Sequence, residues 1–172
     1  MIFGRPHKMA TIKGNIHLEV MKRLRENPKL KGYIKNIHDF NRDVVLSADM
    51  PCIIVHALGA SEAYADFPKR KQDYLILQIR VVQWIKDRIE FKKDVMFDDP
   101  ASNYIGLYTL EADVKNAFEL DPTGLVDDLS YANTGHYPKI KTVSFDNIGQ
   151  NVSAHVVMEM EVDSRYFFTG FR

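Results

Sequence analysis

The last third of the chain carries the clearest alternation of apolar and polar positions. Between Val152 and Val162 every second residue is apolar, and the residues between them are polar except for Val157. Successive side chains of a strand point to opposite faces of a sheet, so this pattern predicts a strand with one buried side. Residues 139–145 form a second strand pattern, and 147–150 make a short connection, which together predict a hairpin. The predicted buried side carries Val152, Ala154, Val156, Met158, Met160 and Val162.

Two other segments repeat apolar residues every three or four positions, which is the spacing of an amphipathic helix. The first begins near Asn15, a plausible N-cap, and ends before Pro28. Its apolar stripe is Ile16, Val20, Met21 and Leu24. The second is predicted to begin at Asp99-Pro100, with Asp99 as N-cap, and to end near Leu120. Its stripe is Leu107, Leu110, Val114 and Ala117, widened by Phe118.

Three further segments are predicted to be strands, and one long segment between the last two is predicted to be a loop. The strand candidates are 32–39, 50–55 and 74–85, of which the last alternates over about twelve residues. Residues 56–73 contain turn-forming glycine, serine and proline and little periodic apolar content, so they are predicted to be a poorly ordered loop.

Strands that are grouped, instead of alternating with helices, favour an α+β fold. The predicted architecture is a single domain with a mostly antiparallel or mixed sheet of about four to five strands, packed by two helices. A flexible arm over residues 1–12, the domain over 13–165 and an aromatic tail over 166–172 complete the predicted organisation.

Composition narrows the functional classes. Lys and Arg number 23 and so do Asp and Glu, so the formal net charge is zero and offers no general attraction to nucleic acid or an anionic membrane. No apolar run is long enough for a membrane span, and a single cysteine, Cys52, allows no internal disulfide. These features predict a soluble, intracellular protein. Six histidines lack the paired spacing of zinc sites, so no metal and no cofactor are expected.

One pattern suggests an enzyme. Asp73, followed after the 74–85 strand by Glu90 and Lys92, resembles the carboxylates and lysine of a Mg²⁺-dependent nuclease, in which the carboxylates hold the metal ion. Glu-x-Lys is common by chance in a chain with 27% charged residues, so this function is kept as the alternative.

Two clusters are candidates for contacts with partners. Lys69, Arg70 and Lys71 place three positive charges together in the predicted loop, where they could meet an acidic patch or DNA. The segment 165–172 contains four aromatic residues among its last seven, which is too much apolar surface to leave in water. These four candidate interface residues are Tyr166, Phe167, Phe168 and Phe171.

The layout resembles the tail terminator, or tail-completion, proteins of long-tailed bacteriophages. The likeness rests on order: an amphipathic helix, a strand led by Pro51, a polar loop, a long strand over 74–84, a helix over 103–120 and an alternating strand over 152–165. It includes no catalytic motif.

The resemblance implies a structural virion protein, without enzymatic activity, that is assembled in the host cytoplasm. It implies a ring, with six copies most expected, that caps the head-proximal end of the tail tube and stops its polymerisation. The implied partners are further copies of the chain, the tail tube protein, the head-tail connector and DNA in the lumen, with no membrane. Another neck protein or a tail-tube subunit fits the same layout.

Overall fold

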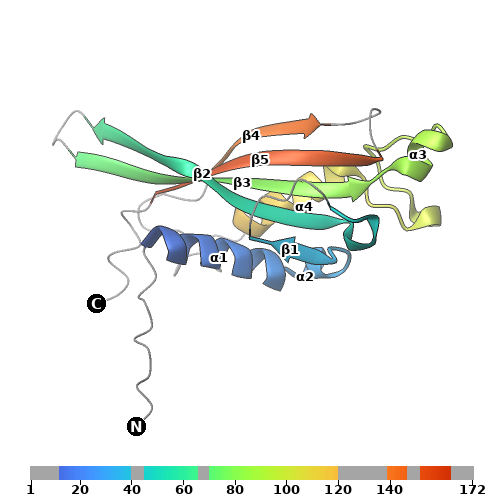
Figure 1. Cartoon of the computed structure of the whole chain (residues 1–172), viewed down its shortest axis with the longest axis horizontal. Helices are drawn as coiled ribbons and strands as arrows, with labels where there is room; N and C mark the ends of the chain where they lie inside the picture. The colour runs from blue at the N-terminus through green and yellow to red at the C-terminus, as the bar shows by residue number, and fades with distance from the viewer. Residues whose placement is uncertain (1–11, 40–44, 66–69, 120–138, 147–151, 164–172) are drawn as a thin grey trace, which may run out of the picture.

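The computed structural model describes residues 12–39, 45–65, 70–119, 139–146 and 152–163 of the chain. It is an α+β domain built on one five-stranded sheet of order β1-β2-β3-β5-β4 (Figure 1). The strands are β1 (Asn36–His38), β2 (Cys52–Ala65), β3 (Arg70–Trp84), β4 (Lys139–Asp146) and β5 (Ser153–Asp163). The helices are α1 (Ile12–Glu26), α2 (Pro28–Lys31), α3 (Lys86–Glu90) and α4 (Leu107–Glu119), and the 3₁₀ turns are η1 (Ser47–Asp49) and η2 (Pro100–Ser102). The predicted fold class is confirmed.

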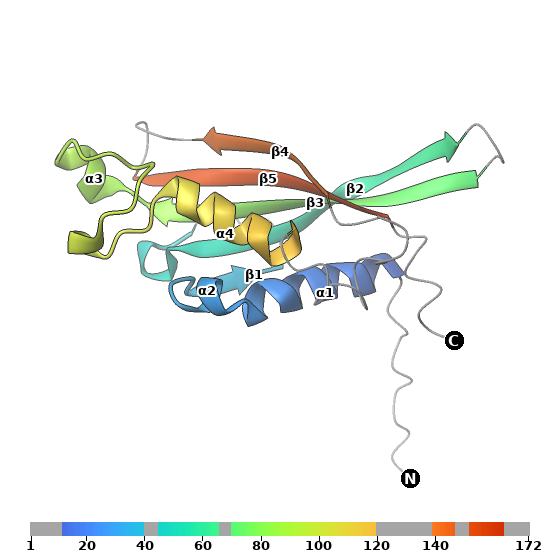
Figure 2. The same cartoon turned by 180° about the vertical axis from the view of Figure 1, so that it is seen from behind.

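Both long helices cover the same face of the sheet (Figure 2). The apolar stripes of α1 and α4 pack there against the inward side of β2, β3 and β5, forming a single core. Ile16, Val20 and Leu24 on α1 have no exposed surface, and neither do Leu107, Leu110, Val114 and Phe118 on α4. The helical spacing of the sequence therefore identified both core stripes.

The alternation along β5 is confirmed with its register. Ala154, Val156, Met158 and Met160 are fully buried, whereas Val152, just before the strand, is 46% exposed. β5 lies between β3 and β4 and pairs antiparallel with both, with Met158 opposite Ile79 on one side and Val143 on the other. Central placement explains the strength of the pattern, because both neighbours extend the buried surface.

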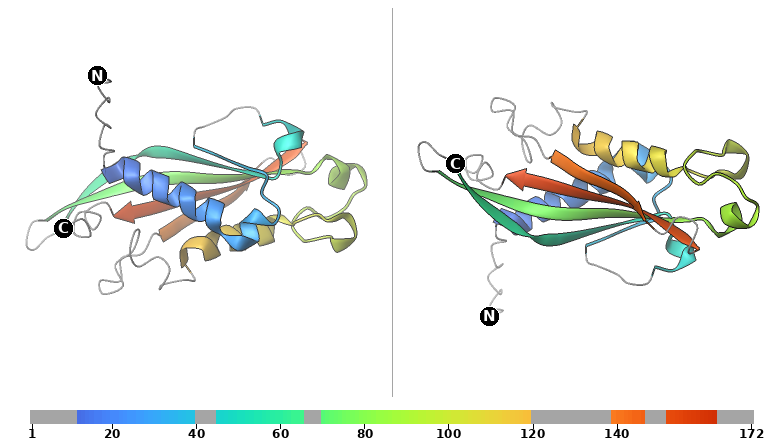
Figure 3. Two further views of the ribbon diagram at one scale, coloured as in Figure 1. Left: turned by 90° about the horizontal axis from the view of Figure 1, so that it is seen from below. Right: turned by 90° about the horizontal axis from the view of Figure 1, so that it is seen from above.

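The sheet has a second, open face (Figure 3). Met50, Cys52, Ile54 and Val82 form a small buried cluster on that side, with Val45 and Trp84 packed against it. Cys52 is buried there as a small apolar residue, as predicted from its position in a strand. Farther along, the half-buried Gln78 of β3 pairs with Glu159 of β5, so this face becomes polar toward the other end of the sheet.

The prediction of a loop over 56–73 is wrong for all the residues of this segment that the structure describes. β2 continues to Ala65, and β3 begins at Arg70, so the two strands form a ladder of thirteen residue pairs. Gly59, taken as a turn residue, lies instead where the register shifts by a bulge. Backbone hydrogen bonds hold a ladder whatever the side chains are, so a segment with little apolar periodicity can still form strands.

Four smaller boundaries also differ from the prediction. Asn15 lies inside α1 instead of capping it, and the strand predicted over 32–39 is only three residues long and parallel to β2. Asp99 does accept a hydrogen bond from a backbone N–H, but it caps the short turn η2, which ends at the left-handed Asn103. α4 therefore begins only at Leu107, and the sequence pattern did not predict α3.

Candidate assembly interface

The β2–β3 hairpin extends past the rest of the sheet as an arm (Figure 1). β5 pairs with β3 only from Tyr74 onward, whereas β2 pairs with β3 down to Arg70. Within the described strands, Glu62–Ala65 and Arg70–Asp73 therefore pair only with each other. A two-stranded ribbon is at best marginally stable in water, so this arm has strand edges and backbone groups with which a neighbouring molecule could pair.

The predicted basic cluster belongs to this arm. Arg70 and Lys71 begin β3 and pair with Ala65 and Tyr64, and Lys69 lies outside the described residues. The structure thus places two of the three positive charges near the far end of a projecting hairpin. The prediction of a basic contact segment stays untested, and its predicted loop conformation is corrected.

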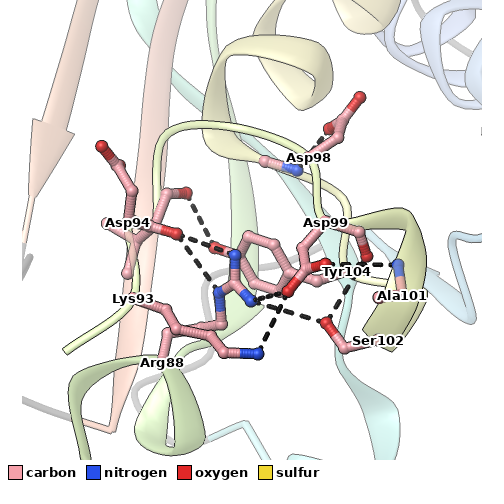
Figure 4. Close-up of polar contacts among 10 residues, drawn as sticks. Arg88, Lys93, Asp94, Asp98, Asp99, Ala101, Ser102 and Tyr104 are labelled. Carbon is pink, nitrogen blue, oxygen red and sulfur yellow. Dashed lines mark hydrogen bonds and ion pairs between the residues drawn. The ribbon is translucent and has the colours of Figure 1, made fainter. Parts of the chain in front are cut away.

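At the opposite end of the sheet, α3 and η2 enclose a buried cation (Figure 4). Arg88 of α3 is only 8% exposed. Its guanidinium forms an ion pair with Asp99, donates to the backbone carbonyl of Asp94 through Nε and a terminal nitrogen, at 3.2 and 3.0 Å, and lies 4.3 Å from the ring centre of Tyr104. A buried charge is costly unless it is paired and hydrogen-bonded, and these contacts meet that condition.

The same contacts set the titration of the cluster. The hydrogen bond from Arg88, supported by Ser102 and by Lys93 at 3.3 Å, holds the pKa of the Asp99 carboxyl well below its usual range. Burial raises the pKa of Tyr104 to about 12, and its hydroxyl donates to the carbonyl oxygen of Val95 at 2.8 Å. Asp99 is therefore ionised and Tyr104 is neutral at physiological pH. Their contacts with Arg88 hold α3 against the loop that contains η2.

The loop between α3 and α4 is fixed by a second carboxylate. Asp98 accepts from the backbone N–H of Gly106 at 2.7 Å and from the Thr109 hydroxyl at 3.0 Å, so it satisfies groups at the start of α4. A Cβ at Gly106 would lie 2.4 Å from the backbone carbon of Phe97, so only glycine allows the loop to pass this close. The prediction that Asp99 is the N-cap of the second long helix is therefore wrong, since Asp98 and not Asp99 accepts the hydrogen bonds at the start of α4.

A groove of about 500 Å³ lies beside Arg88 and its contacts with the η2 loop. Its lining includes Trp84 at the end of β3 and Gln83, whose amide donates to the carbonyl of Ile105 at 2.9 Å. Phe91 stands at its rim with 72% of its surface exposed. The other apolar or aromatic lining residues are Tyr33, Met50, Pro51, Tyr104 and Ile105. The exposed Lys35, Asp87 and Lys93 add charge at its edges.

Sequence reasoning missed this groove. Its residues come from the segments before β1 and β2, the end of β3, α3 and the η2 loop, which only the sheet brings together. One available signal was Phe91, an aromatic residue in a short polar segment without apolar periodicity. A single exposed aromatic residue is common on protein surfaces, so this signal alone does not locate a groove.

The residues of the nuclease alternative do not come together. Asp73 pairs with Glu62 in the arm, whereas Glu90 belongs to α3, beyond the other end of β3, and forms an ion pair with Lys86. The eleven steps from Asp73 to Trp84 alone span about 36 Å of strand. Within the described ranges, no group of three or more His, Cys, Asp or Glu residues could hold a metal ion.

Other sequence candidates are placed as follows. His17, His56 and His155 lie on α1, β2 and β5, and burial lowers the pKa of His17 and of His155. Tyr166, Phe167, Phe168 and Phe171 lie outside the described residues, as do the 147–150 connection and residues 1–11 of the arm predicted over 1–12, whereas Ile12 begins α1. No helix within the described part of the chain is long and apolar enough to cross a membrane.

The comparisons with known proteins concern the fold and not the sequence. No protein-family model matches the sequence, and no curated protein matches it. Among solved structures, a chain of the "Virion of native gene transfer agent (GTA) particle" aligns over 89% of this chain and 96% of its own, with 8% sequence identity and a TM-score of 0.49. A likeness at that identity and TM-score carries no argument about function.

Proposed function

We propose that this protein is a structural virion protein of the tail-terminator type. It forms a ring, most simply of six copies, at the head-proximal end of a phage tail tube, stops tube polymerisation and joins the tail to the head connector. The partners are other copies of the chain, the tube protein and the connector, with DNA passing through the lumen. No cofactor or catalytic step is needed for this role.

The observation that carries the proposal is the hairpin arm. A ribbon of two strands that extends beyond the rest of a five-stranded sheet is poorly stabilised in an isolated subunit and gains backbone contacts from a neighbour. The arm and the groove lie at opposite ends of β3, so a contact from one copy to the next joins unlike surfaces. Unlike-surface contacts repeat around an axis and close into rings or continue as filaments.

Two further features support an assembly role. The order of elements matches the tail-terminator layout noted in the sequence, although the polar loop of that layout is here the hairpin. The formal net charge of zero removes a long-range repulsion between identical copies.

The test is the mass and shape of the full-length protein. Light scattering coupled to size-exclusion chromatography, followed by electron microscopy, should give a closed ring with a central channel, either alone or at the ends of purified tail tubes. A ring that forms only on the tube is consistent, because a template raises the effective affinity between copies. Monomers in both conditions would contradict the proposal, and open filaments would indicate a tube subunit instead.

A further inference from the structure

We propose that the groove beside Arg88 binds the aromatic segment 166–171 of a second copy of this chain. The inference rests on the proposed assembly and names a contact within it.

The groove has the chemistry of a receptor for aromatic side chains. Trp84 and Tyr104 are half-buried in its wall, and Phe91 is largely exposed at its rim. Aromatic rings pack in offset or edge-to-face pairs, and such pairs are favoured beyond the area that they bury. The wall is stiff, because Arg88 is held by Asp99 and by the carbonyl of Asp94. A preformed pocket loses little freedom when it is filled.

The segment after β5 has the matching composition. Residues 166–171 read Tyr-Phe-Phe-Thr-Gly-Phe, with no acidic or basic side chain among them. Arg165 and Arg172 flank it, and the groove edge carries the exposed Asp87 together with Lys35 and with Lys93, which pairs with Asp99, so the match rests on apolar packing and not on charge. Apolar burial at the centre with a charged periphery is the usual anatomy of a contact between proteins.

The segment cannot fill the groove of its own copy. Asp163, the last residue of β5, is opposite Tyr74, whereas Trp84 in the groove is opposite Ser153. The ten steps along β3 from Tyr74 to Trp84 span about 33 Å. Phe168 is five residues beyond Asp163 and so lies at most about 18 Å from it. Tyr166, Phe167 and Phe168 therefore reach the groove only in another copy.

This contact joins the two ends of the molecule. The segment leaves β5 near the arm, and the groove lies beside α3 at the far end (Figure 1). Each copy would insert its segment into the next, and the arm and the segment would contact the same neighbour. A repeated contact of this kind can close into a ring.

Trp84 supplies a direct readout, because it is the one tryptophan of the chain. The protein used is the full-length chain with Tyr166, Phe167, Phe168 and Phe171 all replaced by Ser, so that its own segment is inactive. The probe is a synthetic peptide of residues 163–172, which contains no tryptophan. Titration should shift Trp84 emission to shorter wavelength and saturate. A peptide with the same four Ser replacements should leave the emission unchanged.

A pair of matched variants locates the binding. Phe91→Ser removes the rim aromatic and should weaken peptide binding by at least about tenfold. Phe97→Ser removes an aromatic of similar exposure, 61%, that packs on Tyr108 instead of the groove, and should leave binding within about twofold. Circular dichroism of both variants confirms that each is folded before binding is compared.

The outcomes separate the two proposals. An unchanged Trp84 emission, or equal affinities for Phe91→Ser and Phe97→Ser, would overturn the groove assignment even if the wild-type protein forms rings. Saturable, Phe91-dependent binding would support the assignment even if tail tubes fail to recruit the wild type, which would instead count against the proposed function. Rings of unchanged size from the four-Ser chain would also overturn the assignment.

Discussion

Val156 and Met158 have no exposed surface in β5, between the sheet neighbours and the two covering helices. We expect Val156→Asp and Met158→Asp each to prevent folding, because an unpaired buried carboxylate costs several kcal/mol against a typical total stability of about 5–15 kcal/mol. Circular dichroism and the soluble yield of each variant measure this effect.

The controls lie on the other side of the same strand. Glu159 and Glu161 are half-buried, and Glu161 forms an ion pair with Lys141. Glu159→Gln and Glu161→Gln should change the free energy of unfolding by less than about 1 kcal/mol, because partly exposed ion pairs contribute little. A reversed ranking of thermal midpoints would mean that β5 is shifted by one residue.

The Arg88–Asp99 ion pair gives a pH-dependent prediction. Asp99→Asn keeps an oxygen that can cap Ala101 but removes the charge that pairs with the buried Arg88. The urea midpoint of this variant should lie below that of the wild type at pH 7. The pKa of Asp99 in the folded protein is depressed, so its stabilisation is complete above the unfolded value of about 4 and is lost as the pH falls further.

The difference between the two midpoints should therefore shrink from pH 4 downward, because Asp99 takes up a proton in the unfolded chain at a higher pH than in the folded protein, where its pKa is lowered. Asp87→Asn provides the control, since Asp87 is exposed on the neighbouring α3. Its midpoint should match the wild type at each pH. A wild-type advantage that stayed constant to the lowest pH would argue against an ion pair as the source of stability.

At the scale of elements, the arm can be removed without touching the core. Replacing Glu62–Asp73 by Asn-Gly leaves Ser61 paired with Tyr74 across a two-residue turn, the connection that antiparallel strands prefer. The shortened protein should fold with a thermal midpoint close to that of the wild type, because β5 still pairs with β3 from Tyr74. Its ring formation, measured by light scattering, should be lost.

Rings of the wild-type size from the shortened chain would show that the arm carries none of the assembly contact. Failure to fold would contradict the assignment of the arm as an extension outside the core. A second control replaces residues 66–68 by Gly-Ser-Gly, keeps Lys69, and should assemble normally if the paired strands and their charges make the contact.

At the scale of the whole molecule, charge is expected to govern the partner contact of the arm. Replacing Lys69, Arg70 and Lys71 together by Ser removes three positive charges from a neutral protein and changes no position of the described core. Folding should be unaffected, whereas ring or tail assembly should decrease. The wild-type assembly should also weaken as the salt concentration rises, because salt screens exposed charges.

Measurement of assembly across a salt series, for the wild type and the triple variant, decides this point. The triple variant should lose most of the salt dependence as well as part of the affinity. Wild-type assembly and infectivity from the triple variant would show that these three residues carry no function.

The sequence alone determined the parts of this protein whose periodicity reflects burial. The stripes of α1 and α4 and the buried side of β5 were predicted from their spacing, except for the exposed Val152 and the partly buried Ala117, because one face of each element meets a single large core. The same reasoning predicted the α+β class. It failed for 56–65 and 70–73, which show little apolar periodicity in the sequence and yet pair as strands through their backbones.

Only the tertiary structure decided where the candidate contacts lie. The arm exists because β2 and β3 extend beyond the end of β5. How far one paired strand extends beyond another depends on the register between segments that are distant in the sequence. The groove exists because α3 and the η2 loop fold back over the end of β3, held by the ion pair of Arg88 with Asp99. Neither arrangement leaves a local pattern, since periodicity records which face of an element is buried and not how far one element extends beyond the next.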